Sequence, residues 1–308
     1  METLAYKESK GVVLSNHLKA DLLLILTTIL AGAGWIFSKE ALVGFAPLLF
    51  MCMRFTSAGL LLGCLRFGSL RALSAEQWRA SLRVGVFFGI AIAFWIVGLH
   101  LASHIGVGAF LTSLGVVMVP LVGLLFGERP NRYVFYSLPF VAIGMACLSL
   151  DAEFVIGWGE IFFLVAALFF SLTFILNSRA SARIPAVPLT AIQLVIAGVI
   201  TFLLSSLIES WSFDQPLEIW GWFLASVLLA TSLRFSIQTR AQGLAPASHA
   251  AIIMTLEPVW AALMAVWWLG ERMSLLQVLG CSLIFLAMLV NRWPAVRYWL
   301  RLTRDEKS

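Results

Sequence analysis

Charged side chains are scarce in this sequence of 308 residues. Asp, Glu, Lys and Arg together make up 12% of it, whereas apolar residues make up 61%. Soluble domains usually contain roughly 25% charged and about 45–50% apolar residues. A soluble fold of this length could not bury so much apolar surface, but a lipid bilayer can accommodate it. The composition therefore excludes a soluble domain and predicts an all-α integral membrane protein.

Motifs that would indicate other classes of protein are also missing. The four cysteines lie inside apolar runs without metal-ligand spacing, so we interpret them as small buried hydrophobes. His100 and His104 are four residues apart but have no third ligand nearby, and we interpret them as loop histidines. No Gly-rich phosphate loop is found, which an ATP-driven pump would need in this chain or in a partner. We expect no metal and no cofactor.

Two further classes are disfavoured by what the sequence does not contain. No nucleophile stands beside a base at helical spacing, as an intramembrane enzyme would require. No filter-like loop or ring of like charge indicates a channel. The net charge of +5 does not predict a nucleic-acid partner, because the basic residues lie in the loops between apolar runs.

What the sequence does contain is a series of apolar runs, most of the ~17–25 residues needed to cross a bilayer. We count about ten, at residues 18–38, 47–66, 79–99, 105–126, 132–149, 157–178, 187–208, 218–239, 248–269 and 274–291. The linkers are short and contain turn formers, such as Gly68-Ser69 and the segment from Asp214 to Pro216. The sequence therefore predicts about ten transmembrane helices and no separate soluble domain.

The distribution of basic residues predicts the orientation of these helices. With the N-terminus inside, 17 of the 21 Lys and Arg residues fall on the inner side. Lys39 and Arg272 fall outside, and Arg54 and Arg234 fall within spans. Because positive charge gathers in cytoplasmic loops, this bias predicts that both termini are cytoplasmic.

A repeat divides the chain into two halves. Residues 109–129 read AFLTSLGVVMVPLVGLLFGER and residues 252–272 read IIMTLEPVWAALMAVWWLGER, with the two Gly-Glu-Arg endings 143 positions apart. Five spans per repeat is an odd number, so the second copy must be inverted. We expect a cytoplasmic tail at 1–17, repeats at 18–150 and 151–292, and a cytoplasmic tail at 293–308. Inverted repeats are typical of secondary transporters, whose substrate site lies near the midplane.

Several of these stretches also resemble a known family. The stretches LEPVWAAL (256–263) and LGER (269–272) are similar to the EamA-type branch of the drug/metabolite transporter superfamily. Arg54-Phe55, Lys39, Val119-Pro120-Leu121 and Gln238-Thr239 add to the resemblance. It implies two inverted five-helix repeats around a central cavity lined by the first, third, fourth, sixth, eighth and ninth spans, with the fifth and tenth at the periphery. Many members of that branch export small metabolites, amino acids included.

This chain departs from the family pattern at two positions that such a cavity would include. Ala31 stands in the first span where many relatives have Trp, and Arg234 occupies a position in the eighth span that is usually small or neutral. The substrate therefore does not follow from the resemblance.

Glu257 is the first candidate site residue. It lies about nine residues into the ninth span, which a rise of about 1.5 Å per residue places roughly 13 Å from the inner end. Pro258 cannot donate a backbone hydrogen bond, so it should kink the helix and free a polar backbone group. A carboxylate at mid-membrane is costly and predicts proton coupling or binding of a substrate ammonium group. The alternative is a structural Glu paired with that freed group or with another ion.

Arg234 is the second candidate, with Gln238 one helical turn away on the same face. A short loop joins its span to that of Glu257, so the two side chains could approach and offer one charge of each sign to a zwitterion. The alternative is that Arg234 extends to the inner headgroups and takes no part in binding.

A third group would line the cavity with aromatic and amide side chains. It comprises Trp35, Phe94, Trp95 and Asn177, from the first, third and sixth spans. These residues could equally face lipid or a neighbouring helix, because an all-apolar helix shows no distinct face. We interpret Arg54 as structural, bonding carbonyls or bracing a neighbouring helix, and expect a similar role for Gln193.

These features favour a secondary active transporter in a bacterial-type cytoplasmic (inner) membrane. The leading hypothesis is proton-coupled export of small amino acids or similar zwitterionic metabolites. The alternative is efflux of lipophilic or cationic compounds, favoured if Arg234 points away from the cavity. The partners we expect are a small-molecule substrate, protons and the lipid bilayer; the oligomeric state is left open and is compatible with a monomer.

The charge distribution generates a prediction about topology. Single cysteines placed near Arg71 should be protected from a membrane-impermeant thiol reagent added outside, and those near Asp151 and Asp214 should be labelled, because basic loops stay in the cytoplasm. The measurement is labelling of intact cells against permeabilised cells. External labelling at Arg71 without labelling at Asp151 would contradict the orientation.

Overall fold

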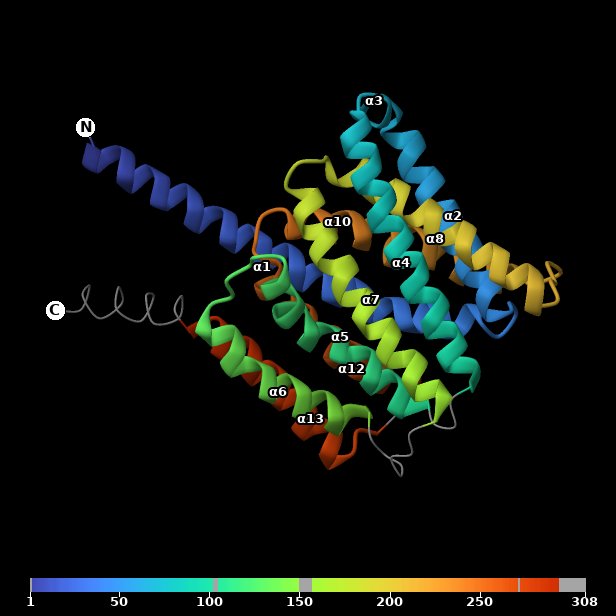
Figure 1. The fold of residues 1–308 in the computed structure, drawn as a ribbon. Coiled ribbons are helices and arrows are strands. Elements are labelled where there is room, and N and C mark those ends of the chain that lie inside the picture. Colours follow the sequence, from blue (N-terminus) through green and yellow to red (C-terminus); the bar gives the residue numbers. More distant parts are fainter. Residues whose placement is uncertain (1, 102–104, 150–156, 271, 294–308) are drawn as a thin grey trace.

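A computed structural model describes residues 2–101, 105–149, 157–270 and 272–293. Within these ranges all regular structure is helical and no strand occurs. In chain order the helices are α1 (Glu2–Ala41), α2 (Pro47–Leu65), α3 (Phe67–Arg71), α4 (Ala75–Leu101), α5 (Ile105–Leu125), α6 (Arg132–Ser149), α7 (Trp158–Ser181), α8 (Ala186–Ile208), α9 (Leu217–Val227), the π-helix η1 (Leu228–Leu233), α10 (Arg234–Gln242), α11 (Ala247–Met254), α12 (Glu257–Leu269) and α13 (Leu275–Asn291) (Figure 1).

The lengths and composition of these helices confirm the membrane class. Seven helical segments of the described chain are long and apolar enough to cross a bilayer, and three shorter apolar helices accompany them. The shorter ones are Phe110–Leu125, Arg132–Leu148 and Leu275–Asn291. Every apolar run predicted above falls on one of these long or short helices. A kink was predicted at Pro258, and the structure has a break between α11 and α12, just before Glu257 and Pro258.

The structure differs from the predicted boundaries at two places. Helix α1 begins at Glu2, so most of the predicted N-terminal tail continues the first span as a helix, which projects from the bundle (Figure 1). Residues 67–71 form the short helix α3, where a turn at Gly68-Ser69 was expected. Hydropathy marks where a helix can enter the bilayer, but it does not mark where the helix itself begins. The predicted tail from residue 294 onward and the loop around Asp151 lie outside the described residues.

Helices from the two halves of the chain pair with one another. Helix α2 packs along α8, and α6 packs along α13; the two pairs lie at opposite edges of the bundle (Figure 1). Helix α4 packs along α7, while α1 packs against α10, α11 and α12. Since every one of these contacts joins residues before 150 to residues after 157, neither half forms a separate body.

Glycines let α1 lie between two segments that carry polar residues. A Cβ atom on Gly32 would lie 2.7 Å from Cβ of Trp260 and 3.0 Å from the backbone nitrogen of Ala261. A Cβ atom on Gly34 would lie 2.7 Å from Cβ of Ala230. The backbone of α1 therefore contacts α12 on one side and η1 on the other, as small residues allow in membrane helices.

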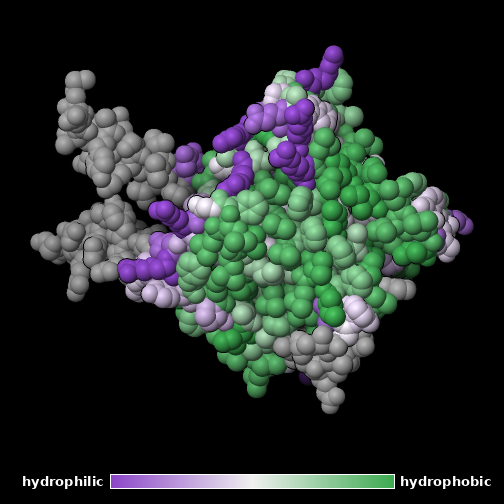
Figure 2. Space-filling view, in the orientation of Figure 1, coloured by the Kyte–Doolittle hydropathy of each residue, from purple (hydrophilic) through white to green (hydrophobic). Residues whose placement is uncertain are grey.

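The surface is divided into a broad apolar part, which suits lipid, and charged ends, which suit water. Apolar side chains cover most of the visible face, and hydrophilic ones gather over α3 and on the side from which α1 projects (Figure 2). Arg66, Arg71 and Arg79, at and around α3, are all exposed. A broad apolar surface with charge confined to its ends is what a bilayer requires.

Two glycines of α2 provide a matched test of the packing between the halves. A Cβ on Gly59 would lie 2.8 Å from the backbone nitrogen of Val195 and 2.9 Å from the carbonyl oxygen of Ala191, both on α8. Gly63 lies one turn further on and has nothing within 4 Å of that position. We expect Gly59→Ala to lower the free energy of unfolding by about 1–3 kcal/mol, as overpacking typically does. Gly63→Ala should be neutral or stabilising by up to about 1 kcal/mol, because Ala favours a helix. Thermal unfolding in detergent measures both, and equal effects would contradict the tight contact.

Candidate functional site

The helix break in the ninth apolar run places Glu257 at the start of a helix. Helix α11 ends at Met254, and the backbone nitrogens of Thr255 and Leu256 bond the carbonyl oxygens three residues earlier, at 3.2 and 3.1 Å. Helix α12 then begins at Glu257, with Pro258 in its first turn, where a missing N–H is tolerated. The positive end of α12 stabilises a carboxylate at this position. Because the candidate span runs from Ala247 to Trp268, Glu257 lies near its middle.

Glu257 forms an ion pair with Arg234. The Nη2 atom of Arg234 lies 3.1 Å from Oε2 of Glu257, and the two side chains are 14% and 28% exposed. The second carboxylate oxygen, Oε1, accepts a bond of 3.3 Å from the indole nitrogen of Trp35 on α1. The sequence left open whether Arg234 pairs with Glu257; in the structure the two side chains meet, and Trp35 joins them. Partial exposure leaves the pair accessible to a ligand.

Arg234 keeps donors that the ion pair does not use. Its guanidinium lies 4.3 Å from the ring centroid of Phe235, a cation–π contact that fixes its plane. Its Nε atom is buried and has no hydrogen-bond partner among the described residues. A guanidinium with free donors beside a carboxylate can bind a second anionic group.

Arg54 supports the site from α2. Its Nη1 donates to Oγ of Ser38 at 2.8 Å, its Nη2 donates to the carbonyl oxygen of Ala230 at 3.3 Å, and its Nε donates to Oγ1 of Thr231. The prediction that Arg54 braces a neighbouring helix is confirmed. The π-helix η1 that it contacts ends immediately before Arg234.

The amide side chains lie further along α10 and α7. Asn177 is 5% exposed, and its Nδ2 donates to Oε1 of Gln242 and, at 3.4 Å, to Oγ1 of Thr239. The carbonyl oxygen of the Gln238 side chain is buried and has no partner among the described residues. Neither amide bonds the ion pair. Gln242 and Thr239 were not predicted, although they follow Arg234 and Gln238 on the same short helix.

The aromatic residues of α4 face other helices. Phe94 stacks on Phe162 and Phe169 of α7, with ring centroids 5.8 and 5.7 Å apart. Trp95 packs against the apolar clusters that contain Phe88 and Leu111. The structure thus brings Trp35 to the ion pair, but it places Phe94 and Trp95 at contacts within the bundle. Gln193, expected to resemble Arg54, is buried with its Oε1 unpaired among the described residues.

A family model identifies the class of protein to which this site belongs. The family model described as "EamA-like transporter family" matches residues 18–150 and 157–293. The chain belongs to the EamA-like transporter family. The resemblance seen in the sequence is thereby confirmed, and the transporter class favours transport over catalysis for the ion pair.

Two similar proteins are also named as transporters, and neither name states a substrate. Two proteins from Archaeoglobus fulgidus (strain ATCC 49558 / DSM 4304 / JCM 9628 / NBRC 100126 / VC-16) are each named "Uncharacterized transporter". One is 27% identical over 285 residues, covering 92% of this chain and 89% of its own. The other is 23% identical over 212 residues, covering 69% and 76%. A solved crystal structure with 18% identity has a TM-score of 0.77 and covers 91% of this chain and 98% of its own, which supports the fold alone.

A second polar cluster of the transporter was not predicted. Nε2 of His249 on α11 lies 3.0 Å from Oδ1 of Asp21 on α1, and its Nδ1 lies 3.0 Å from Nδ2 of Asn291 on α13. Arg292 forms an ion pair with the other oxygen of Asp21, and burial lowers the pKa of Arg292. Asp21 inside an apolar run was the sequence signal for this cluster. The cluster ties α1 to the last two spans at the end where α1 enters the bundle.

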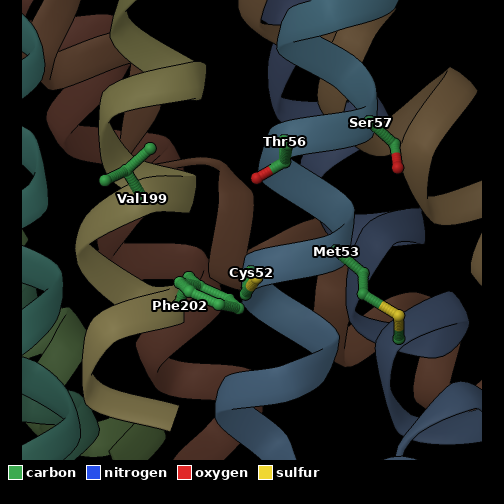
Figure 3. Close-up of a pocket in the computed structure, with 6 residues that line it drawn as sticks. All are labelled: Cys52, Met53, Thr56, Ser57, Val199 and Phe202. Carbon is green, nitrogen blue, oxygen red and sulfur yellow. The ribbon is translucent and has the colours of Figure 1, made fainter. Parts of the chain in front are cut away.

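An apolar groove lies apart from both polar clusters, between α2 and α8. It has a volume of about 340 Å³ and is lined by Cys52, Met53, Thr56, Ser57, Val199 and Phe202 (Figure 3). None of these residues is charged, so the groove adds no ionic group to the site. The described residues contain no group of three His, Cys, Asp or Glu residues that could hold a metal ion.

Proposed function

We propose that this EamA-like protein is a secondary active transporter that exports small amino acids or similar zwitterionic metabolites across the cytoplasmic membrane in exchange for protons. The observation that carries the proposal is the ion pair between Arg234 and Glu257, at 3.1 Å and partly exposed, at a helix break within a membrane span. Charged residues at this depth are costly and mark transport pathways in membrane proteins.

The proposal includes the architecture. All ten apolar segments cross the membrane, as two inverted five-helix repeats around a central cavity, with both termini in the cytoplasm. The pairing of α2 with α8 and of α6 with α13 supports it, since these helices hold equivalent places in the two repeats. A site between inverted repeats near the midplane is the arrangement that allows alternating access.

Competition for Glu257 provides the coupling. When Glu257 is ionised, it pairs with Arg234 or with the ammonium group of a bound amino acid. When a proton neutralises it, the attraction to the ammonium group is lost and the amino acid leaves. Proton and substrate therefore occupy the site by turns, which is the requirement for antiport. Arg234 holds the substrate carboxylate, for which its Nε atom is a donor without a partner among the described residues.

One observation favours a second candidate, the efflux of lipophilic cations. The side chain of Trp35 is 55% exposed and lies beside the carboxylate of Glu257. An indole face next to a carboxylate suits a cationic group. In this case Arg234 serves only to neutralise the charge of Glu257, and replacing Arg234 should leave transport unchanged.

The first test concerns proton coupling. Glu257→Gln keeps the size of the side chain, but its amide does not take up a proton near neutral pH. Uptake driven by a pH gradient into inverted proteoliposomes should therefore fall to background. Exchange of labelled for unlabelled amino acid at equal pH needs no proton, so it should persist, but only at a higher substrate concentration, because the neutral Gln no longer attracts the ammonium group. The control is Glu209→Gln, whose wild-type carboxylate caps α2 at the backbone nitrogens of Leu48 and Leu49, at 2.8 and 2.7 Å, and bonds neither member of the pair. Unchanged pH-driven flux in Glu257→Gln would leave Glu257 a structural residue.

The second test concerns the carboxylate. Arg234→Lys keeps the charge but loses the planar fork, so it should weaken binding of an amino acid by about tenfold or more, corresponding to about 1.4 kcal/mol. The amide of the same amino acid lacks the carboxylate and should lose little. Binding of both ligands to purified wild type and variant measures the difference. Equal losses for acid and amide, or none, would remove Arg234 from the binding site.

A further inference from the structure

The side chain of Arg234 follows directly on a π-helical turn. Helix α9 ends at Val227, η1 covers Leu228–Leu233, and Arg234 opens α10. A π-helical turn contains about one residue more than an α-helical turn. One residue corresponds to a rotation of roughly 100° about the helix axis. If the turn closed to a regular α-helix, Arg234 would therefore leave the face on which it meets Glu257.

Arg54 makes two of its three hydrogen bonds to this turn. Its Nη2 donates to the carbonyl oxygen of Ala230 at 3.3 Å, and its Nε donates to the hydroxyl of Thr231. The Thr231 hydroxyl in turn donates to the carbonyl oxygen of Ser226, five residues earlier, at 2.8 Å. Thr231 is fully buried, so no solvent replaces these bonds. Backbone groups released from regular pairing inside a membrane must find partners in the protein, and Arg54 with Thr231 provides them.

The chemistry of Arg54 fits this role better than ion pairing. Among the described residues, no carboxylate forms an ion pair with Arg54. Charged side chains within a membrane span pair with one another or with backbone carbonyls, and Arg54 does the latter at Ala230. The planar guanidinium can reach a carbonyl and a hydroxyl on adjacent residues at once, which the single ammonium of Lys cannot do with fixed geometry.

We propose that Arg54 is a positioning residue, which holds the π-helical turn open and thereby aims Arg234 at Glu257. It acts from α2 on a residue in the other half of the chain. The proposal deepens the proposed function, since it names the residue that sets the geometry of the ion pair. The positioning role is independent of the proposed function; only the expected effect of Arg54 on substrate binding rests on it.

The first experiment measures the geometry without any substrate. Cysteines replace Arg234 and Glu257 in a chain whose four native cysteines are changed to alanine, and a short bifunctional thiol reagent links them. We expect the yield of the cross-link to fall by about threefold or more when Arg54→Lys or Thr231→Val is added, because a rotation of roughly 100° separates the two positions. Ser38→Ala is the matched control. It removes the third bond of Arg54, to α1, and leaves both bonds to η1, so the yield should stay within about twofold of the parent.

The second experiment measures recognition in the chain that retains Arg234 and Glu257. Arg54→Lys and Thr231→Val should reduce the preference for an amino acid over its amide by about tenfold, as Arg234→Lys does. The double variant Arg54→Lys/Arg234→Lys should lose little more than either single variant, because residues that act as one unit are not additive. A residue that merely stabilises packing would lower the binding of acid and amide alike.

The outcomes separate the two proposals. Reduced cross-linking in Arg54→Lys and Thr231→Val, with Ser38→Ala unaffected, supports the positioning role whatever the substrate is. Cross-linking that is unchanged in both variants, or lowered equally in all three, overturns it. Wild-type protein that does not distinguish acid from amide refutes the proposed function, while the cross-linking still decides the role of Arg54.

Discussion

An ion pair inside the bilayer imposes the main constraint on this molecule. Insertion scales place the cost of one charged side chain at a helix centre at about 2.5–3.5 kcal/mol. Arg234 and Glu257 offset part of this cost by pairing at 3.1 Å. The rest is offset by groups that each come from a different segment: the indole of Trp35 on α1, the ring of Phe235 and the start of α12. Positioning so many partners around two side chains requires irregular backbone.

The irregular backbone occurs where the pair needs it. Helix α11 breaks just before Glu257, and the π-helix η1 lies just before Arg234. Gly32 lets α1 contact α12, the helix that follows the break. Gly34 lets α1 contact η1 itself. Non-helical backbone is tolerated within a membrane only where protein or a water-filled cavity satisfies its polar groups. The hydroxyl of Thr231 and the guanidinium of Arg54 meet this need at η1.

The sequence alone predicted the parts of this arrangement that depend on composition and on single residues. Apolar runs located the helices, Pro258 located the break, and the cost of isolated charges singled out Arg54, Arg234 and Glu257. The π-helix was missed because LLATSL differs little from its neighbours in hydropathy. Contacts between distant residues were also missed, since His249 and Asp21 are 228 residues apart in the chain. The all-apolar face of α4 could not show that Phe94 packs on α7.

Side chains of α1 bond the ninth span at three positions, and this has a consequence for the proposed cycle. Asp21 bonds His249, the Thr28 hydroxyl accepts from the indole of Trp260 at 3.1 Å, and Trp35 bonds Glu257. Asp21 and Trp35 are 14 positions apart, roughly 21 Å along the helix. If α1 moves away from α11 and α12, Asp21 and His249 separate at the end of the bundle, where water can replace the lost bond. Glu257 loses the bond from Trp35 to its Oε1 at mid-span, where water is scarce, so that this oxygen needs a new donor as its partner while Oε2 stays with Arg234. A proton or a substrate ammonium group is such a partner. The requirement that Oε1 of Glu257 keeps a partner would thus link the movement of the helices to the exchange of ligands.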